Sequence, residues 1–149
     1  MEREAYMKAA LALAQEAAEA GEVPVGCVIV DRSGTIIGTG RNRRETDRNA
    51  LAHAEIEAIA AACRAVGDWR LDDCTIYVTL EPCPMCTGAI INARIPSVVY
   101  GAKDAATGSC GSVINLFEER YGHKPAVYGG VLQPECSDLL TAFFQRLRG

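Results

Sequence analysis

Two cysteines and a histidine–glutamate pair are the residues of this chain best suited to chemistry. The stretch "PCPMC" places Cys83 and Cys86 three positions apart, and "HAE" places His53 two positions before Glu55. A C-x-x-C pair can be a redox pair, half of a metal site or two core residues, and on its own it does not distinguish these roles. Taken with the histidine, one imidazole and two thiolates make the three protein ligands of a zinc site.

A structural zinc ion would need a fourth protein ligand, so the remaining cysteines and the second histidine matter. Cys63 lies ten residues beyond His53, about 15 Å away along a helix that rises about 1.5 Å per residue. Cys74 begins the strand that leads to the site and lies roughly 20 Å from its far end. Spacing alone does not exclude four other residues as the fourth ligand: Cys27, Cys110, His123 and Cys136. An open fourth position filled by water is the simpler interpretation, and it indicates catalysis.

Both groups fall where helices are expected to begin. Apolar residues recur at i, i+3, i+4 and i+7 over residues 52–66, which predicts an amphipathic helix with His53 and Glu55 in its first turns. Asn49 or a near neighbour is its expected cap. A second helix is expected after the apolar stretch "CTIYVTL", with a proline in its first turn and the two cysteines at its start. The positive end of its dipole favours the thiolate form, which binds metals.

The rest of the chain supplies the elements that hold these helix starts together. They are a helix over residues 3–20, a β-hairpin over 24–42, strands at 74–80, 97–102 and 126–132, a short helical piece near 116, and a last helix over 136–148. A hairpin followed by alternating helix and strand predicts an α/β fold, a three-layer α/β/α sandwich with a mixed sheet of about five strands. In such sheets a site forms beyond the carboxyl ends of the strands.

Length and composition predict one soluble domain over residues 1–149. Hydrophobic residues make up 49% and charged residues 23%, as in ordinary globular proteins. The apolar runs are much shorter than the roughly 20 residues of a membrane-spanning helix, and the acidic N-terminal stretch argues against a signal peptide. Seven cysteines, an odd number spread through apolar segments, favour reduced thiols. A cytoplasmic protein without membrane contact is therefore expected.

The charge of the chain does not by itself predict a nucleic-acid partner. The formal net charge is -4, unlike that of proteins that bind nucleic acid through bulk charge. Four arginines gather in "GRNRRETDRNA": Arg41, Arg43, Arg44 and Arg48. Because Glu45 and Asp47 stand among them, a solvated loop is the first interpretation of this cluster.

H-x-E followed by P-C-x-x-C is a known signature of zinc nucleobase deaminases. The flanking blocks are more specific: "EVPVGCVIV", "GRN", "AHAEIEAI", "IYVTLEPCPMCTGAI", "VVYGAKDAATG" and "GVLQPEC". Over nearly its whole length the chain resembles the bacterial tRNA-specific adenosine deaminases, the TadA family. The resemblance implies a cytidine deaminase-like fold and conversion of adenosine to inosine at the wobble position of a tRNA anticodon.

The same resemblance implies the roles of the central residues. His53, Cys83 and Cys86 bind one Zn²⁺ per subunit, and a zinc-bound hydroxide attacks C6 of adenine. Glu55 moves protons from the water to N1 and then to the departing ammonia. The implied partners are a tRNA anticodon arm, of an arginine tRNA, and a second copy of the chain in a homodimer.

Substrate contacts are the least constrained part of the resemblance. Asn42 resembles a residue that contacts the target nucleotide, although an asparagine after a strand is also a common turn residue. Asp104 matches a position beside the RNA, and a local turn is an equal alternative. The backbone of Ala54 and the side chains of Val25 and Leu80 are expected pocket walls. Candidates for phosphate contacts are Arg44, Lys103, Arg146 and Arg148.

Phe144 could stack on a base or fill the core, and its helical stripe with Leu139, Leu140, Phe143 and Leu147 favours the core. In one respect the chain departs from the family: many members continue with a lysine-rich tail beyond the position of Gly149, so weaker RNA affinity is expected.

Two alternatives stay open. A zinc deaminase of a free base or nucleotide, such as guanine, is mildly favoured by the negative charge, but the arginine cluster and "GAKDAATG" argue against it. A non-catalytic zinc-binding or RNA-binding module would need a fourth protein ligand and would have no use for Glu55.

Overall fold

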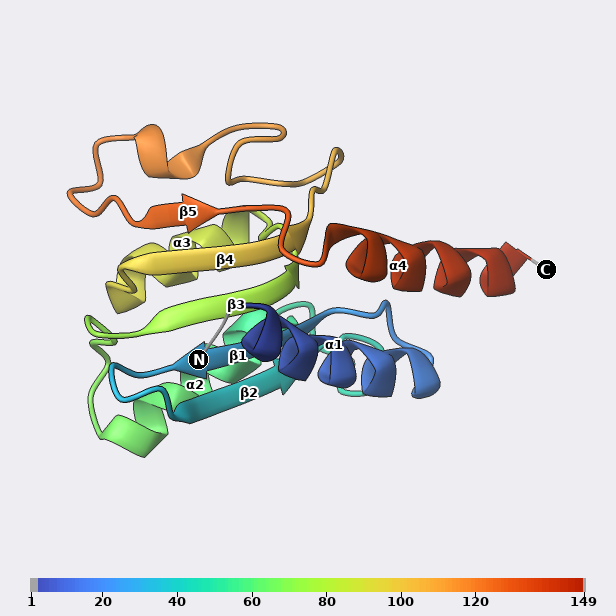
Figure 1. The fold of residues 1–149 in the computed structure, drawn as a ribbon, viewed down its shortest axis with the longest axis horizontal. Helices are drawn as coiled ribbons and strands as arrows, with labels where there is room; N and C mark the ends of the chain where they lie inside the picture. The colour runs from blue at the N-terminus through green and yellow to red at the C-terminus, as the bar shows by residue number, and fades with distance from the viewer. Residues whose placement is uncertain (1–2, 149) are drawn as a thin grey trace.

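The computed structural model describes residues 3–148 and has an α/β architecture (Figure 1). Its elements are α1 (Arg3–Glu19), β1 (Gly26–Val30), β2 (Ile36–Arg41), α2 (Ala54–Val66), β3 (Thr75–Leu80), α3 (Pro84–Ala93), β4 (Ser97–Ala102), the 3₁₀ turn η1 (Leu116–Glu118), β5 (Ala126–Tyr128) and α4 (Gln133–Arg148). No helix in the described part is long and apolar enough to cross a membrane.

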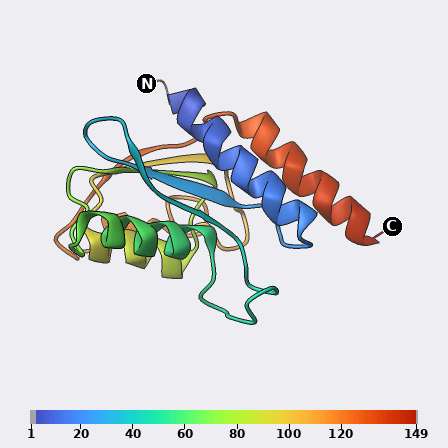
Figure 2. The ribbon, with the colours of Figure 1, turned by 90° about the horizontal axis from the view of Figure 1, so that it is seen from below.

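The strands form one mixed sheet in the order β2-β1-β3-β4-β5. β1 pairs antiparallel with both β2 and β3, whereas β3, β4 and β5 pair in parallel. Helices α1 and α4 cover one face of the sheet, and α2 and α3 cover the other (Figure 2). The predicted three-layer sandwich with five strands is confirmed.

Alternation along the central strand divides the core between the two faces. In β3, Ile76 and Val78 pack in the cluster beneath α2 and α3, and Tyr77 packs with Met7 of α1 on the opposite face. Such alternation follows from the two-residue period of a strand. Because both faces of β3 are buried, the strand holds its carboxyl end in a fixed position.

Three element boundaries differ from prediction. α2 begins at Ala54 with His53 at its N-cap, and Asn49 instead accepts a hydrogen bond from the N–H of Leu51 within the preceding loop (2.9 Å). β5 ends at Tyr128, four residues earlier than expected, and the next residue, Gly129, lies close to the ring of Tyr100. α4 starts three residues earlier than expected, at Gln133 rather than at residue 136.

The predicted apolar stripe of α4 is only partly buried. Cys136 and Phe143 are buried, but Phe144 is 41% exposed and Leu147 is 68% exposed. The reason is that α4 extends beyond the sheet (Figure 1), so its last turns have no core to cover. The expectation that Phe144 fills the core was therefore wrong.

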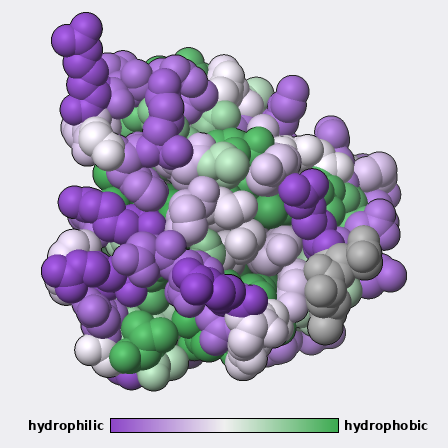
Figure 3. Space-filling view, turned by 60° about the vertical axis from the view of Figure 1, so that its left-hand side comes forward, coloured by the Kyte–Doolittle hydropathy of each residue, from purple (hydrophilic) through white to green (hydrophobic). Residues whose placement is uncertain are grey.

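The edge of the sheet at the amino ends of β3 and β4 comes forward in Figure 3. Hydrophilic side chains cover most of this side, with separate apolar areas between them. The candidate catalytic and metal-binding residues lie on the opposite side, at the carboxyl ends of these strands.

Gly40 in β2 sets how closely α2 approaches the sheet. A Cβ atom there would meet the backbone oxygen of Ala54 and stand 2.8 Å from the backbone nitrogen of Ala58. Both contacts are to backbone, so a larger residue must displace the first turns of α2. This is the part of α2 that follows His53 and contains Glu55.

We expect Gly40→Ala to lower the free energy of unfolding by about 1–3 kcal/mol, as overpacking commonly does. Thr39→Ala is the matched control, because Thr39 is its exposed neighbour in the same strand, and surface changes usually stay within about 0.5 kcal/mol. Urea unfolding of both variants measures the effect. Equal stability of the two variants would contradict close packing of α2 on β2.

Candidate active site

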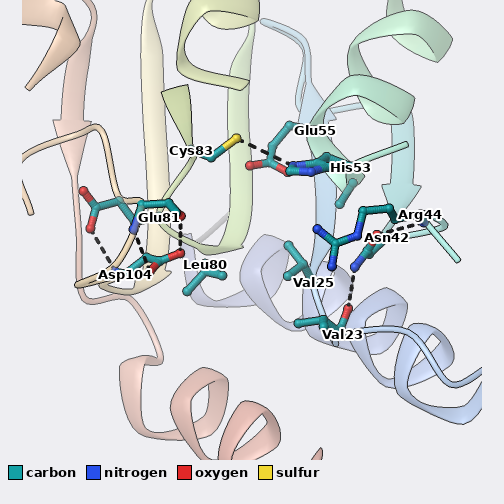
Figure 4. Close-up of a pocket in the computed structure, with 12 residues that line it drawn as sticks. Val23, Val25, Asn42, Arg44, His53, Glu55, Leu80, Glu81, Cys83 and Asp104 are labelled. Carbon is teal, nitrogen blue, oxygen red and sulfur yellow. Dashed lines mark hydrogen bonds between the residues drawn. The ribbon is translucent and has the colours of Figure 1, made fainter. Parts of the chain in front are cut away.

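A pocket of about 150 Å³ lies at the carboxyl edge of the sheet (Figure 4). Because β2, β3, β4 and β5 run in one direction and β1 in the other, four strands end on this side of the sheet and β1 begins there. The pocket is lined by Val23, Val25, Asn42, Arg44, His53, Ala54, Glu55, Leu80, Glu81, Cys83, Asp104 and Thr107. The site therefore lies where the fold class predicts it.

His53, Cys83 and Cys86 meet beside this pocket. His53 Nδ1 is 3.7 Å from Cys83 Sγ and 3.5 Å from Cys86 Sγ, and all three ligand atoms lie within 4.8 Å of one another. His53 caps α2, Cys83 caps α3 and Cys86 lies in the first turn of α3. The fold thus brings His53 to two cysteines that lie 30 and 33 residues later in the chain.

Within residues 3–148 the group contains no fourth histidine, cysteine or carboxylate. Cys27, Cys110, His123 and Cys136 are outside it. His123 instead contacts the backbone oxygen of Ile95 through Nε2 (2.7 Å), near the start of β4.

The three donor groups interact directly with one another. Hydrogen bonding from the Cys86 thiol, helped by His53, lowers the pKa of Cys83 to about 4 against the effect of burial. The same contact raises the pKa of Cys86, and hydrogen bonding to Cys83 raises the pKa of His53. Two sulfurs next to an imidazole form a soft nitrogen and sulfur donor set. Such a set fits Zn²⁺.

Glu55 lies in the first turn of α2, next to His53 (Figure 4). It is only 4% exposed, and burial, reinforced by the charge of Cys83, raises its pKa to about 7. A carboxyl group with such a pKa can both take and give a proton near neutral pH, as general acid–base catalysis requires. Its position at the pocket allows it to act on a bound molecule.

Asn42 is held in place by two hydrogen bonds. Its Nδ2 donates to the backbone oxygen of Val23 (3.3 Å), and its Oδ1 accepts from the N–H of Arg44 (3.0 Å). A side-chain amide has two N–H donors and an oxygen with two lone pairs. One donor and one acceptor position therefore remain for a bound molecule, and the residue also organises the turn after β2.

Glu81 was not predicted from the sequence, although it lines the pocket. Its buried carboxylate accepts hydrogen bonds from the N–H groups of Asp104 (3.1 Å), Cys110 (3.0 Å) and Ser112 (3.1 Å), and from the Ser112 hydroxyl. Burial opposes ionisation, but these donors hold the pKa of Glu81 below its usual value. Glu81 thereby fixes the loop after β4.

The structure brings some of the predicted substrate contacts to the pocket and not others. Asp104 lines it, and its carboxylate also accepts from the N–H groups of Ala106 (3.0 Å) and Thr107 (3.2 Å), so it forms the local turn as well. Lys103 instead borders a separate hollow with Tyr100 and Ser112. Phe144 lies on α4, outside the pocket lining.

Comparison with known proteins agrees with this geometry. A family model described as MafB19-like deaminase matches residues 1–148. The chain is similar to a tRNA-specific adenosine deaminase of Bacillus subtilis (strain 168), with 50% identity over 146 residues, 97% of this chain and 90% of that protein.

Two solved structures are informative. One comes from work on A-to-I editing by tRNA:A34 deaminases at the wobble position of transfer RNA. It has a TM-score of 0.88 and 41% identity, and the match covers 91% of this chain and 98% of that chain. The other, a guanine deaminase from Bacillus subtilis, has a TM-score of 0.67 and 37% identity. The match covers 99% of this chain and 94% of the guanine deaminase chain.

Proposed function

The chain belongs to the MafB19-like deaminases and to the tRNA-specific adenosine deaminases, and on this premise we propose that it converts adenosine to inosine at the wobble position of a tRNA anticodon. The observation that carries the proposal is the group His53, Cys83 and Cys86 next to the buried Glu55, in a pocket of about 150 Å³. A pocket of this size suits one base that has left its stack.

His53, Cys83 and Cys86 would hold one zinc ion, which when bound activates a water molecule for attack on C6 of adenine. Glu55 takes a proton from the water on its carboxylate and delivers it to N1 of the base. It then takes the proton of the new C6 hydroxyl group and transfers it to the leaving amino group, so that the C6–N bond breaks, the C6 carbonyl of inosine forms and ammonia departs. A carboxyl pKa of about 7 fits both steps.

The pocket walls suit a flipped purine. Val25 and Leu80 offer apolar surfaces to the faces of the base, and the backbone of Ala54 lies beside Glu55. Asn42 offers its remaining donor and acceptor to the nucleotide. Bases in an anticodon loop are unpaired, which lowers the cost of moving one into the pocket.

The rim would contact the rest of the anticodon arm. Arg44 and Asp104 lie on opposite walls of the pocket (Figure 4). The remaining proposed contacts are Lys103, Phe144, Arg146 and Arg148, the last three on the part of α4 that extends beyond the sheet. Exposed arginines suit phosphates, and an exposed aromatic ring suits base stacking. We propose an arginine tRNA as the substrate.

A guanine-type deaminase is the second candidate, favoured by the likeness to the guanine deaminase structure. Ammonia release separates the two. Zinc-loaded protein is given, in separate reactions, an anticodon stem-loop with adenosine at the wobble position, free guanine and a pyrimidine nucleotide. We expect ammonia from the stem-loop only. Ammonia release from free guanine and none from the RNA would show that the enzyme acts on small molecules, and would overturn the proposal.

We also propose that the protein is a homodimer. An apolar groove on the outer side of α2 and α3 is lined by Leu51, Ile56, Pro84, Met85, Gly88, Ala89, Ile91, Asn92, Leu116 and Tyr121. Tyr121 is 59% exposed and Leu51 is 57% exposed. Large exposed apolar side chains around a groove are typical of interaction surfaces, and tyrosine is a frequent anchor at them.

Tyr121→Asp is expected to convert the dimer to a monomer, because it places a charge in the apolar interface. Val66→Asp is the control, since Val66 is similarly exposed (47%) but lies outside the groove. Light scattering after size-exclusion chromatography gives the masses. A wild-type monomer, or a dimer that survives Tyr121→Asp, would contradict this interface.

Two further proposals concern the setting of the enzyme. One deaminase domain spans residues 1–149, with the site formed by elements along most of its length. It works in the cytoplasm, where tRNA is available and where the seven free cysteines remain reduced.

A further inference from the structure

Glu22 is a buried carboxylate that the chemistry of the pocket does not use. It lies between α1 and β1 and is only 1% exposed. None of the ion pairs among residues 3–148 includes it. The charge of Arg41 favours the ionised form from a distance, but a buried charge remains costly unless hydrogen bonds satisfy it. The donors that reach Glu22 therefore identify the segment that it holds.

Those donors all come from the loop between β2 and α2. Glu22 Oε1 accepts from the N–H of Glu45 (3.1 Å), and Oε2 accepts from the N–H and the hydroxyl of Thr46 (both 2.6 Å). Burial opposes ionisation, but these hydrogen bonds hold the pKa of Glu22 below its usual value. The carboxylate is therefore tied to the arginine loop, defined as residues 43–49.

The other contacts of the arginine loop are mostly internal: the N–H groups of Asp47, Arg48 and Asn49 donate to backbone oxygens within the loop, and Arg43 pairs with Asp47 (3.3 Å). Residues 44–51 are exposed, so no apolar side chain there is buried in the core. The loop nevertheless carries Arg44 to the pocket wall, and it leads directly to His53 at its far end. A loop of this kind would normally be mobile, and Glu22 contacts it one and two residues after Arg44.

A second connection joins the same region to the pocket. Val23, the neighbour of Glu22, accepts the hydrogen bond from Asn42 Nδ2 (3.3 Å), and Asn42 in turn accepts from the N–H of Arg44 (3.0 Å). Glu22 and Val23 thus hold the loop at both its start and its middle. Asn42 and Arg44 both line the pocket.

We propose that Glu22 is a positioning residue that fixes the arginine loop, so that Arg44 and Asn42 already face the pocket before RNA binds. This inference rests on the proposed function. A preorganised rim avoids the cost of ordering the loop when the anticodon arm arrives. The contribution of Glu22 should therefore appear in RNA binding and not in the proton transfers at Glu55.

Glu22→Gln tests this with little change in shape. The amide replaces one of the two acceptor oxygens with an NH₂ donor, so the hydrogen bonds on one side of the anchor, to Glu45 or to Thr46, are lost. With zinc-loaded protein and the wobble stem-loop, we expect KM to rise about tenfold and kcat to stay within about twofold. Glu19→Gln removes the same charge from an exposed position nearby and should leave both constants unchanged.

A double-mutant cycle separates positioning from general destabilisation. If Glu22 acts through Arg44, Arg44→Ala should raise KM much less in the Glu22→Gln background than in the wild type, whereas Lys103→Ala, on the other loop, should have its full effect in both. Additive effects of Glu22→Gln and Arg44→Ala would overturn the inference. If Glu22→Gln does not fold, Thr46→Val replaces it in the same double-mutant cycle. This substitution removes only the hydroxyl group that donates to Glu22.

The wild-type reaction distinguishes the two levels of proposal. Inosine from the wild type together with an unchanged KM in Glu22→Gln overturns only the positioning role. No inosine from the wild type overturns the proposed function, and the RNA-positioning role falls with it. Amide exchange at Glu45 and Thr46 adds a readout without RNA: it should accelerate in Glu22→Gln but not in Glu19→Gln, and equal rates would contradict the anchor.

Discussion

Glu55→Gln is expected to abolish turnover while the protein keeps its zinc. Glutamine has nearly the same shape but cannot take or give a proton, and proton transfer of this kind contributes about 10²–10⁴-fold to rate. We therefore expect kcat on the wobble stem-loop to fall by about 10³-fold or more. Single-turnover inosine formation measures the rate, and elemental analysis of the dialysed protein measures zinc.

The buried position of Glu55 makes this variant informative. Burial raises the pKa of the native carboxyl to about 7, so a neutral amide at 4% exposure should not weaken folding. Turnover near the wild-type rate would remove Glu55 from the proton transfers. Loss of zinc would show instead that Glu55 supports the metal site.

Cys83→Ala is expected to lose both zinc and activity. Cys83 is one of three donors within 4.8 Å of one another, and its low pKa makes it a ready thiolate. Even outer-shell changes commonly weaken metal binding about 10–100-fold, so loss of a direct ligand should cost at least about a hundredfold. Chelator competition measures the affinity, and inosine formation should fall in parallel.

Cys63→Ala is the matched control for the ligand variant. Cys63 is a partly buried cysteine of α2 that lies outside the metal group. Its thiol donates a hydrogen bond to the backbone oxygen of Trp69 (3.7 Å). Zinc content and turnover should stay at wild-type levels. If Cys63→Ala lost zinc and Cys83→Ala retained it, the ligand assignment would be wrong.

Local sequence signals predicted the central elements because each depends on few neighbours. The stripe over residues 52–66 and the prolines around Cys83 are short-range features, and they mark helix starts correctly to within two residues. The rule that strands of one direction end at one edge then brings His53 to the cysteines. The two helix starts do meet there, with His53 Nδ1 3.5 Å from Cys86 Sγ.

Features that depend on where a loop returns could not be predicted. Glu81 follows an apolar strand and Glu22 precedes one, and nothing in either neighbourhood identifies the backbone N–H groups that satisfy them. Those donors lie more than 20 residues away in the chain. Burial of a carboxylate between elements is thus a tertiary property. An acidic residue next to a buried strand, with no basic neighbour, is the only signal that could have suggested it.

α4 shows the opposite failure, in which a local signal was misleading. Leu139, Phe143 and Leu147 have helical spacing, but burial depends on how far the sheet extends beneath the helix. α4 extends beyond it (Figure 1), so Leu147 is 68% exposed. Periodicity shows which face of a helix is apolar and not what covers that face.

Inosine mapping on an arginine-tRNA anticodon stem-loop is the most direct test of wobble adenosine deamination. Zinc-loaded protein is incubated with one RNA that carries adenosine at the wobble position and with a second that carries it elsewhere in the loop, and reverse transcription locates inosine. Inosine at the wobble position of the first RNA, and none in the second, is the predicted result. No inosine in the first RNA, or equal inosine in both, would contradict a wobble-specific adenosine deaminase.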